Sequence, residues 1–373
     1  MYLNKDINDY YIIEKLLAEK LEMEKPEFIK SVYIYGSLAK DEIIPYKSNL
    51  NILVIINDEL FKSTELSLIK EIKNAVSIKN INLVFNIYTI TDITNKERNT
   101  PLLFPFLNDI LVNSYVIYGE NIEHLIYEQI NNMSVDYVKL ESEIVFNKII
   151  PAKFITAYLE NKKYEMITQI YDLYKYITYF KKIELNLDYH IKEQDLDSDY
   201  LLNLFCILRK ESNNLDYESK LKEIKERNVI PGRAAGVILF NTNLKKVLIL
   251  EHSCDGGGWW AFPKGGIEKQ EPHRDAINRE VYEETGITNI NIKDYLYQTN
   301  HLYTGSINRI RKTKTFFYFA TTEESEVKLS EEHLNFKWVD INDAKNYIKS
   351  NYLLFILGLA GAKIGLLENL FPK

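Results

Sequence analysis

Three glutamates lie close together in the segment from Trp260 to Ile287, WAFPKGGIEKQEPHRDAINREVYEETGI. If this segment is a helix, Glu280, Glu283 and Glu284 share one side of it, because residues three and four apart are neighbours on a helix surface. Like charges at that spacing repel, and a divalent cation would relieve the repulsion. Carboxylate oxygens suit Mg²⁺ or Mn²⁺, which also bind phosphates. The segment therefore predicts metal-assisted attack of water on a phosphate.

Pro272 and Gly286 mark the two ends of the predicted helix. Proline is common at a helix start and glycine just past the end, so the pair encloses about three turns. Ile277 and Val281 lie four residues apart and predict the buried face of the helix. A solvated acidic face is the alternative interpretation of a short cluster of glutamates.

The complete spacing resembles the Nudix box. Gly265 is followed by five residues and Glu271, and seven more residues lead to Arg279. Seven fixed identities give a chance match on the order of 10^-9 per starting position. The resemblance implies that Arg279 braces the glutamates and that Glu271 supports the loop. It also implies metal ligands and a proton acceptor. The ligands are Glu280, Glu283, Glu284, Glu332 and the backbone carbonyl of Gly265 or Lys264, and the acceptor is Glu280, Glu284 or Glu332.

The flanking segments resemble the asymmetric diadenosine tetraphosphate hydrolases across residues 232 to 350. The similar segments are RAAGVILF, WWAFPKGGIEKQE, RKTKTFFYFA and LSEEHLNFKWVD. In that family a carboxylate from the last segment joins the metal cluster, which makes Glu332 the candidate here. Aromatic side chains flank an adenine in the family, and Tyr303, Phe317 and Tyr318 are the candidates for this role.

Basic residues near the box match the charge of a polyphosphate. Their guanidinium and ammonium groups could neutralise phosphates. The alternative is an ordinary solvated edge strand whose charges prevent pairing with another sheet. Lys264, within FPKGG, stands apart from the strand residues. The set is Lys264, Arg309, Arg311, Lys312 and Lys314.

Two other functions stay open. The mRNA-decapping Nudix enzymes share the run REVYEETG, so pyrophosphohydrolysis of an RNA 5′ end is an alternative to a dinucleoside polyphosphate. The net charge of −7 and the segment SEEHLNFKW favour the dinucleotide. A nucleotide-sensing regulator, in which the Nudix part only reads a ligand, is the second alternative.

The first 121 residues predict a small α/β domain. A helix is expected over residues 9 to 24, strands over 32 to 35, 50 to 56 and 81 to 90, and a helix over 62 to 76. The run VYIYGSLAKDEIIPYKSNLNILVI, with Gly36-Ser37, resembles the minimal nucleotidyltransferase domain. In that family two aspartates hold the metal ions, and here Asn49 and Asn51 stand at those positions. The resemblance therefore implies a catalytically inactive domain that senses a ligand or docks a partner. A Gly-Ser turn in any α/β hairpin is the alternative.

The rest of the chain predicts a helical bundle over residues 122 to 228 and a Nudix domain over residues 229 to 373. Helices are expected between residues 122 and 227, because Leu, Ile and Tyr recur at three and four residues. Strands are expected over 233 to 240, 246 to 251, 289 to 299, 313 to 320 and 336 to 339, and helices over 341 to 349 and 351 to 369. The fold class is α/β (α+β), with an α/β/α sandwich at the C-terminal end.

Composition limits the setting of the protein. Two cysteines in 373 residues, without metal-like spacing, favour a reducing compartment such as the cytoplasm. We expect no signal peptide, and the apolar run from Tyr352 to Ala362 is too short to span a bilayer. The expected partners are a nucleotide substrate and Mg²⁺ or Mn²⁺, with no membrane. A second copy or another protein could bind through residues 1 to 228.

Overall fold

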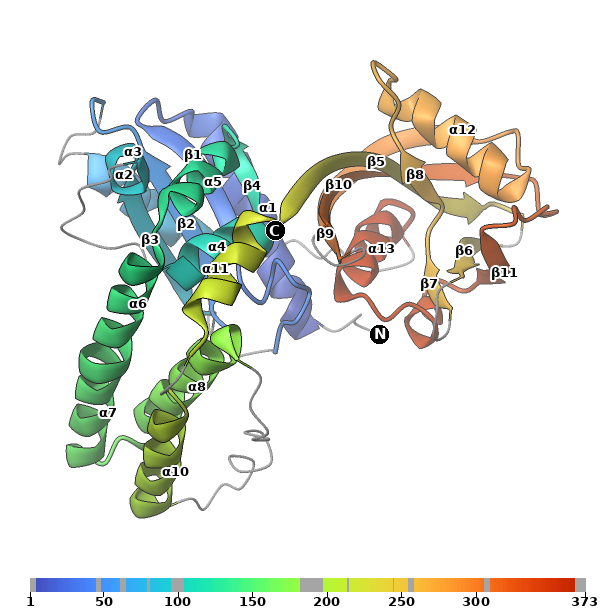
Figure 1. The fold of residues 1–373 in the computed structure, drawn as a ribbon. Coiled ribbons are helices and arrows are strands. Elements are labelled where there is room, and N and C mark those ends of the chain that lie inside the picture. Colours follow the sequence, from blue (N-terminus) through green and yellow to red (C-terminus); the bar gives the residue numbers. More distant parts are fainter. Residues whose placement is uncertain are drawn as a thin grey trace. The chain divides into compact units, whose positions relative to one another are not determined.

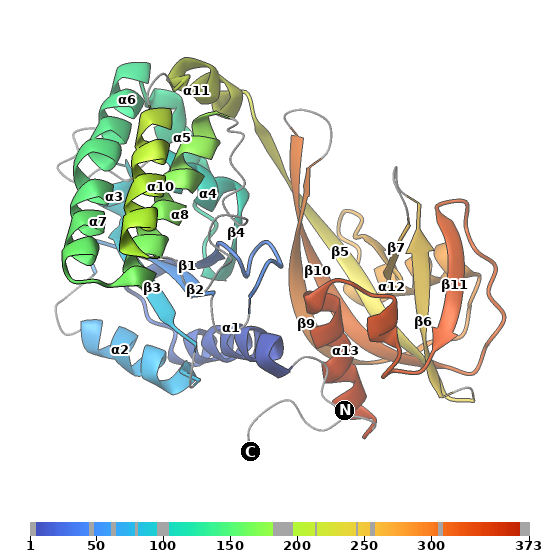
Figure 2. The ribbon, with the colours of Figure 1, turned by 90° about the horizontal axis from the view of Figure 1, so that it is seen from below.

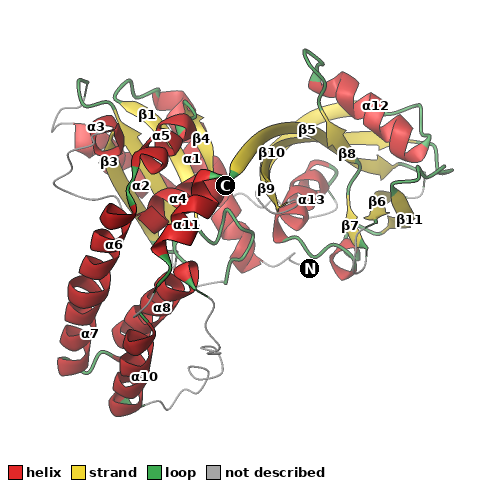
Figure 3. Cartoon of the chain, viewed as in Figure 1, coloured by secondary structure: helices red, strands yellow, loops and turns green. Residues whose placement is uncertain are grey.

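The computed structural model describes residues 5–44, 48–60, 65–78, 81–94, 104–181, 197–212, 215–243, 245–253, 258–304 and 309–365. It contains helices and two mixed sheets, which confirms the expected α/β class (Figure 3). The chain forms two compact units. Unit 1 comprises Met1–Thr89, Val112–Asn121 and Asn228–Lys373, and unit 2 comprises Ile90–Leu111 and Ile122–Arg227. No helix in the described ranges is long and apolar enough to cross a membrane.

The first sheet of unit 1 has four strands in the order β3-β2-β1-β4 (Figure 1). Strand β1 runs antiparallel to β2 and to β4, whereas β2 and β3 are parallel. Apolar side chains of α1 and α2 pack on this sheet through residues such as Leu17, Leu21 and Ile72. The elements are α1 (Lys5–Glu24), β1 (Ile29–Tyr35), β2 (Leu50–Ile56), α2 (Glu65–Val76), β3 (Leu83–Thr89) and β4 (Ser114–Gly119).

Unit 2 is helical, as the spacing of Leu, Ile and Tyr predicts. One π-helical turn interrupts the series and ends at Ile149, shortly before Pro151, which lacks an N–H for the regular helical ladder. The elements are α3 (Ile90–Thr94), α4 (Phe104–Val112), α5 (Glu123–Asn132), α6 (Val135–Ile144), η1 (Val145–Ile149), α7 (Ile150–Leu159), α8 (Lys163–Phe180), α10 (Ser198–Glu211) and α11 (Tyr217–Lys225). The sequence did not predict α4.

The second sheet of unit 1 has the strand order β11-β6-β5-β10-β9, with β7 paired to β6 and β8 paired to β5. Its strands are β5 (Asn228–Asn241), β6 (Lys246–His252), β7 (Trp259–Ala261), β8 (Lys264–Gly266), β9 (Asn291–Thr304), β10 (Arg309–Thr322) and β11 (His333–Val339). Strand β5 pairs in parallel with β10 along its whole length. With this pairing, β5 begins at Asn228 rather than at the predicted residue 233, and β10 begins at Arg309 rather than at 313.

Helices cover both faces of the second sheet (Figure 2). Helix α12 (His273–Thr285) buries Ala276, Ile277 and Val281 on one face. Helix α13 (Asn351–Lys363) buries Phe355 and Ile356 on the other. The predicted helix over 341 to 349 is wrong in length, because only the short 3-10 turn η2 (Ala344–Asn346) forms there.

The two sheets of unit 1 share a hydrophobic core. Tyr11 of α1 contacts Tyr352 and Phe355 of α13, with ring centroids 4.7 Å and 5.2 Å apart. Beside them, Glu14 is fully buried and accepts hydrogen bonds from the hydroxyls of Tyr115 at 2.8 Å and Tyr297 at 3.2 Å. The α13 side of the second sheet therefore shares its core with the first sheet, whereas the α12 side has a separate hydrophobic cluster of its own.

Candidate active site

Helix α12 begins and ends where the sequence predicts. Pro272 is its N-cap residue, and Gly286, with φ of 71°, closes it through an N–H to the Tyr282 carbonyl at 2.8 Å. A left-handed φ is available to glycine at little cost, which explains the residue at this position. The buried face formed by Ile277 and Val281 fixes the rotation of the helix about its axis. That rotation directs the glutamate side toward β8.

Gly265 of β8 lies directly against Glu280. A Cβ atom at position 265 would coincide with the carboxylate of Glu280. Strand β8 is held by its pairing with β5, in which Ala235 lies opposite Gly265. The close approach therefore places the backbone of the loop beside a carboxylate of the helix.

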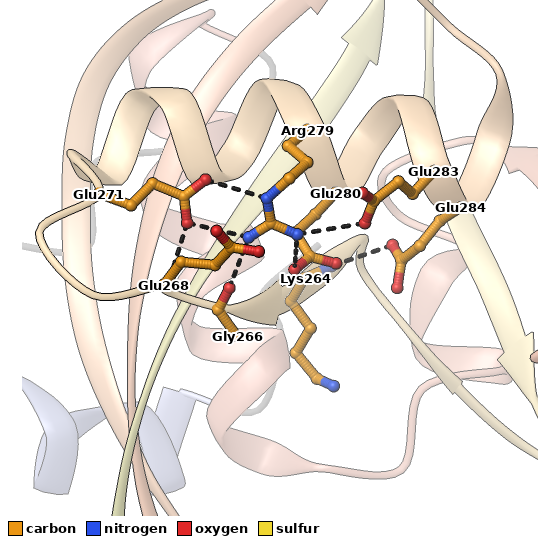
Figure 4. A network of polar contacts seen from close by, with 8 residues as sticks. All are labelled: Lys264, Gly266, Glu268, Glu271, Arg279, Glu280, Glu283 and Glu284. Carbon is orange, nitrogen blue, oxygen red and sulfur yellow. Dashed lines mark hydrogen bonds and ion pairs between the residues drawn. The ribbon is translucent and has the colours of Figure 1, made fainter.

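Arg279 holds three glutamates and the loop together (Figure 4). Its guanidinium donates to both oxygens of Glu271 at 2.9 Å, to Glu280 at 2.7 Å and to Glu283 at 3.1 Å. It also donates to the carbonyl of Gly266 at 2.7 Å. The hydrogen bonds from Arg279 lower the pKa of Glu271 to about 2. Glu271 is therefore a fixed anion, whose role in this geometry is to orient the arginine.

Glu284 is the buried carboxylate of the group. It is 6% exposed and accepts a hydrogen bond from the backbone N–H of Lys264 at 3.2 Å. Burial raises the pKa of Glu284 to about 8, and the charges of Glu280 and Glu332 add to the effect. Burial also raises the pKa of Glu280. The cationic side chains of the protein therefore do not fully balance the negative charges of Glu280 and Glu284.

These residues fit a divalent cation. The donors are oxygens only, and a cation would supply the charge that Glu280 and Glu284 lack. Among the described residues, the buried Nε2 atom of His333 has no hydrogen-bond partner and lies 3.5 Å from Glu284 Oε1. In the same ranges, no three His, Cys, Asp or Glu side chains already surround one point. Glu283 in particular turns toward Arg279 (Figure 4).

His333 adjoins Glu284, and His252 and Trp259 follow it in a row of ring contacts; none of the three was given a role from the sequence. His333 is fixed by a contact between its Nδ1 and Ser330 Oγ at 3.0 Å. Its ring lies 4.5 Å from that of His252, which stacks on Trp259 at 4.2 Å. The position of His333 within SEEH was a signal for this neighbourhood. His252 and Trp259 gave no such signal, because only the pairing of β6 with β7 brings them together.

The predicted substrate residues have different surroundings. Phe317 is 1% exposed and packs in the core, so it is withdrawn as a partner for adenine. Tyr318 is half-buried, and its hydroxyl lies 3.1 Å from His273 Nδ1. The side chain of Tyr303 falls outside the described residues. Lys314 is partly buried over the ring of Phe316, with its Nζ 5.7 Å from the ring centroid.

Strand β10 is not an edge strand. It lies between β5 and β9, so the alternative interpretation of its basic residues as edge protection is wrong. Arg233 of β5 adds a further cation on this part of the sheet, 5.4 Å from the ring of Phe316 and 3.0 Å from His273 Nε2. The side chain of Arg309 falls outside the described residues.

Amide groups occupy the predicted metal positions of the N-terminal sheet. Asn82 donates to Asn49 at 3.0 Å, and Asn86 donates to the hydroxyl of Tyr35. Gly36 has φ of 81°, and a Cβ atom there would lie 3.0 Å from the amide nitrogen of Asn51. The Asn82 amide therefore pairs with the amide of Asn49, and that of Asn86 pairs with the hydroxyl of Tyr35. The nucleotidyltransferase-like nature of this part stays a prediction.

The comparisons with known proteins agree with this geometry. The NUDIX domain model matches residues 230–355. An RNA pyrophosphohydrolase of Bartonella henselae is 34% identical over 140 residues, which are 32% of this chain and 81% of that protein. The rat bis(5′-nucleosyl)-tetraphosphatase (asymmetrical) is 29% identical over 125 residues, 30% of this chain and 81% of that protein. The m7GpppN-mRNA hydrolase dcap-2 of Caenorhabditis elegans is 37% identical over 81 residues, 21% of this chain and only 10% of that protein. The chain belongs to the Nudix family and is a Nudix hydrolase.

Proposed function

We propose that the protein is a Mg²⁺-dependent pyrophosphohydrolase that cleaves a dinucleoside polyphosphate such as diadenosine tetraphosphate. The observation that carries this proposal is the placement of Glu280 and Glu284 against the backbone of Lys264 and Gly265. Both carboxylates have a raised pKa, which is the expected state of a cation site without its cation. Mn²⁺ is an alternative ion, because it prefers the same oxygen ligands.

The proposed roles of the side chains are to bind the ion and to accept a proton. Glu280, Glu283, Glu284 and Glu332, with the carbonyl of Gly265, would hold the ion. When bound, the ion polarises a phosphoryl group and makes a water more acidic. Glu280, Glu284 or Glu332 then accepts the proton of the attacking water. Arg279 keeps Glu280 and Glu283 in place through its hydrogen bonds.

Cations on the second sheet match the rest of the polyphosphate. The backbone N–H of Lys264 donates to Glu284, and burial lowers the pKa of the Lys264 side chain. Lys314 is partly buried, and its pKa is also lowered by burial. A bound phosphate would raise the pKa of both lysines again, because a nearby opposite charge favours the charged form. Lys264 and Lys314 are therefore the proposed phosphate contacts, and Tyr318, further along β10 than Lys314, stays the proposed base contact.

The dinucleotide is favoured by the segment SEEHLNFKW and by similarity to the rat tetraphosphatase over 81% of that protein. Pyrophosphohydrolysis of an RNA 5′ end is the second candidate. It is favoured by the similarity to the Bartonella henselae enzyme and by the cations on β5 and β10. In either case, we propose that residues 1 to 121 sense a ligand or dock a partner. Amides at the predicted metal positions support that role.

Product analysis tests the proposal. The purified full chain is incubated with diadenosine tetraphosphate, triphosphate RNA, capped RNA and ADP-ribose, each with Mg²⁺ or with a chelator. We expect ATP and AMP from diadenosine tetraphosphate, only when Mg²⁺ is present. Preferred release of pyrophosphate from RNA would select the second candidate. No Mg²⁺-dependent product from any of these compounds would favour the nucleotide-sensing regulator.

A further inference from the structure

Among the glutamates of α12, all of which the structure describes, Glu284 is the one that Arg279 does not hold. The guanidinium donates to Glu280 at 2.7 Å and to Glu283 at 3.1 Å (Figure 4). Glu284 instead accepts a hydrogen bond at its Oε2 atom from the backbone N–H of Lys264, 3.2 Å away. Its second oxygen, Oε1, faces a side chain that comes from a different part of the chain.

The side chain that faces this oxygen is His333 of β11. Its Nε2 atom lies 3.5 Å from Oε1 of Glu284, just beyond ordinary hydrogen-bond length, and the His333 side chain is fully buried. In the part of the chain that the structure describes, no other group forms a hydrogen bond with this nitrogen. Hydrogen bonds to catalytic groups are often long in ligand-free sites and shorten when the ligand binds. The nitrogen is therefore available to Glu284.

Backbone hydrogen bonds fix His333 beside the last turn of α12. The N–H of Lys328 donates to the carbonyl of Thr285 at 2.8 Å, and the N–H of Ser330 donates to the carbonyl of Glu284 at 3.2 Å. The N–H of His333 donates in turn to the carbonyl of Ser330 at 3.3 Å. The segment that leads into β11 is therefore bonded to the same residue whose carboxylate His333 faces.

The hydroxyl of Ser330 allows Nε2 of His333 to be the donor. Ser330 Oγ lies 3.0 Å from Nδ1 of His333, and a hydroxyl can donate to that nitrogen. When Glu284 is ionised, an Nε2 atom without hydrogen would place two acceptors against each other. Nε2 therefore carries the hydrogen, and Nδ1 accepts from Ser330. Lys264 and His333 then offer one donor to each oxygen of the carboxylate, and the remaining lone pairs are left for a cation.

We propose that His333 is a positioning residue, which holds the Glu284 carboxylate in the orientation that binds the cation. It does for Glu284 what Arg279 does for the other two glutamates of α12. This inference rests on the proposed function and specifies how its cation site is built. Without such a donor, the like charge of Glu280 four residues away would turn Glu284 aside. Removal of a group that hydrogen-bonds to a metal ligand commonly costs about 10- to 100-fold in metal affinity or activity.

Two amide substitutions separate the donor from the packing. The amide nitrogen of His333→Gln reaches the place of Nε2, whereas that of His333→Asn reaches only the place of Nδ1. Each full-length variant is assayed on its preferred polyphosphate over a range of Mg²⁺ concentrations. The rise of its thermal midpoint with Mg²⁺ is measured without substrate, because an ion that binds the folded state stabilises it.

We expect His333→Asn to need about 10-fold more Mg²⁺ for half-maximal activity and to lose most of the Mg²⁺-induced rise in thermal midpoint. At saturating Mg²⁺, its kcat should stay about 10-fold or more below the native value, with KM little changed. His333→Gln should recover most of these losses, because it keeps a donor for Glu284. Trp338→Phe is the control on the same strand. It removes the indole hydrogen bond to the carbonyl of Ser325 and should respond to Mg²⁺ as the native protein does.

Two results would overturn the positioning role. One is an equal response to Mg²⁺ in His333→Asn and the native protein, which would show that Glu284 needs no donor from β11. The other is an equal loss in His333→Asn and His333→Gln, which would assign His333 to packing alone. If the native chain hydrolyses no polyphosphate but only His333→Asn loses its stabilisation by Mg²⁺, the proposed function fails and the positioning role stands.

Discussion

Gly265 and Glu280 are so close that any side chain at position 265 would occupy the place of the Glu280 carboxylate. Gly265→Ala must therefore displace either the loop or the glutamate. We expect kcat/KM to fall about 100-fold or more, because small displacements of catalytic groups have large effects on rate. Steady-state kinetics on the preferred polyphosphate measures it. Gly266→Ala is the matched control, since nothing lies within 4 Å of a Cβ atom there. Equal activity of the two variants would contradict the predicted geometry.

Glu284→Gln keeps the shape of the side chain and removes its charge. We expect kcat to fall by about three orders of magnitude, because a metal ligand and possible proton acceptor is lost. Mg²⁺ should raise the thermal midpoint of the native protein but not that of the variant, because a ligand of the folded state stabilises it. The exposed Glu326→Gln serves as the control. A native response to Mg²⁺ in Glu284→Gln would remove this residue from the cation site.

The buried carboxyl group of Glu14 should make the stability of the folded protein depend on pH. Its burial raises the pKa to about 7, above the unfolded value near 4.5, so the folded state binds more protons between these values. The stabilisation is complete below about pH 4.5 and is lost as the pH rises through 7. Glu14→Gln should reduce the fall in thermal midpoint between pH 5 and pH 8. Measuring both proteins in a Glu284→Gln background without metal removes the contribution of Glu284. An unchanged fall would show that Glu14 does not titrate in this range.

The contacts of Tyr11 predict that helix α1 stabilises the Nudix part of the chain. Its ring contacts Tyr352 and Phe355, and it is fully buried. Tyr11→Ala should lower the free energy of unfolding by about 3 kcal/mol, the usual size for a buried aromatic. Met23→Ala on the same helix, 68% exposed, should change it by less than about 0.5 kcal/mol. Chemical denaturation of the full chain gives both values, and a similar small change for Tyr11→Ala would contradict the shared core.

The sequence predicted the elements whose signals are local. Pro272, Gly286 and the spacing of Ile277 and Val281 were sufficient for α12, and apolar runs located most strands. The early part of β5 was missed because Pro231 and Gly232 indicate a break in a strand, and that of β10 because three of its four residues are cationic. The pairing of the two strands with each other holds both parts in place. The short 3-10 turn at Ala344–Asn346 kept the buried spacing of a helix without its length.

The sequence predicted only the part of the site whose residues belong to one continuous segment of the chain. The grouping of Arg279 with Glu271, Glu280 and Glu283 follows from positions on one helix and its loop. Phe317 was misplaced because the sequence does not show that its side of β10 lies in the core that α13 shares with the first sheet. Trp259 was missed because its partner His252 is on another strand, and strand register is not visible in the sequence.

The pairing of β5 with β10 has a consequence for synthesis of the chain. Asn228 pairs with Arg309 and Asn241 with Thr322, so about eighty residues must be translated after β5 before its partner exists. Until then, β5 leaves the ribosome with an open hydrogen-bonding edge, a state that favours association with other nascent chains. Slow translation between these strands would prolong that exposure, so codon choice and chaperone supply should influence the yield of folded enzyme.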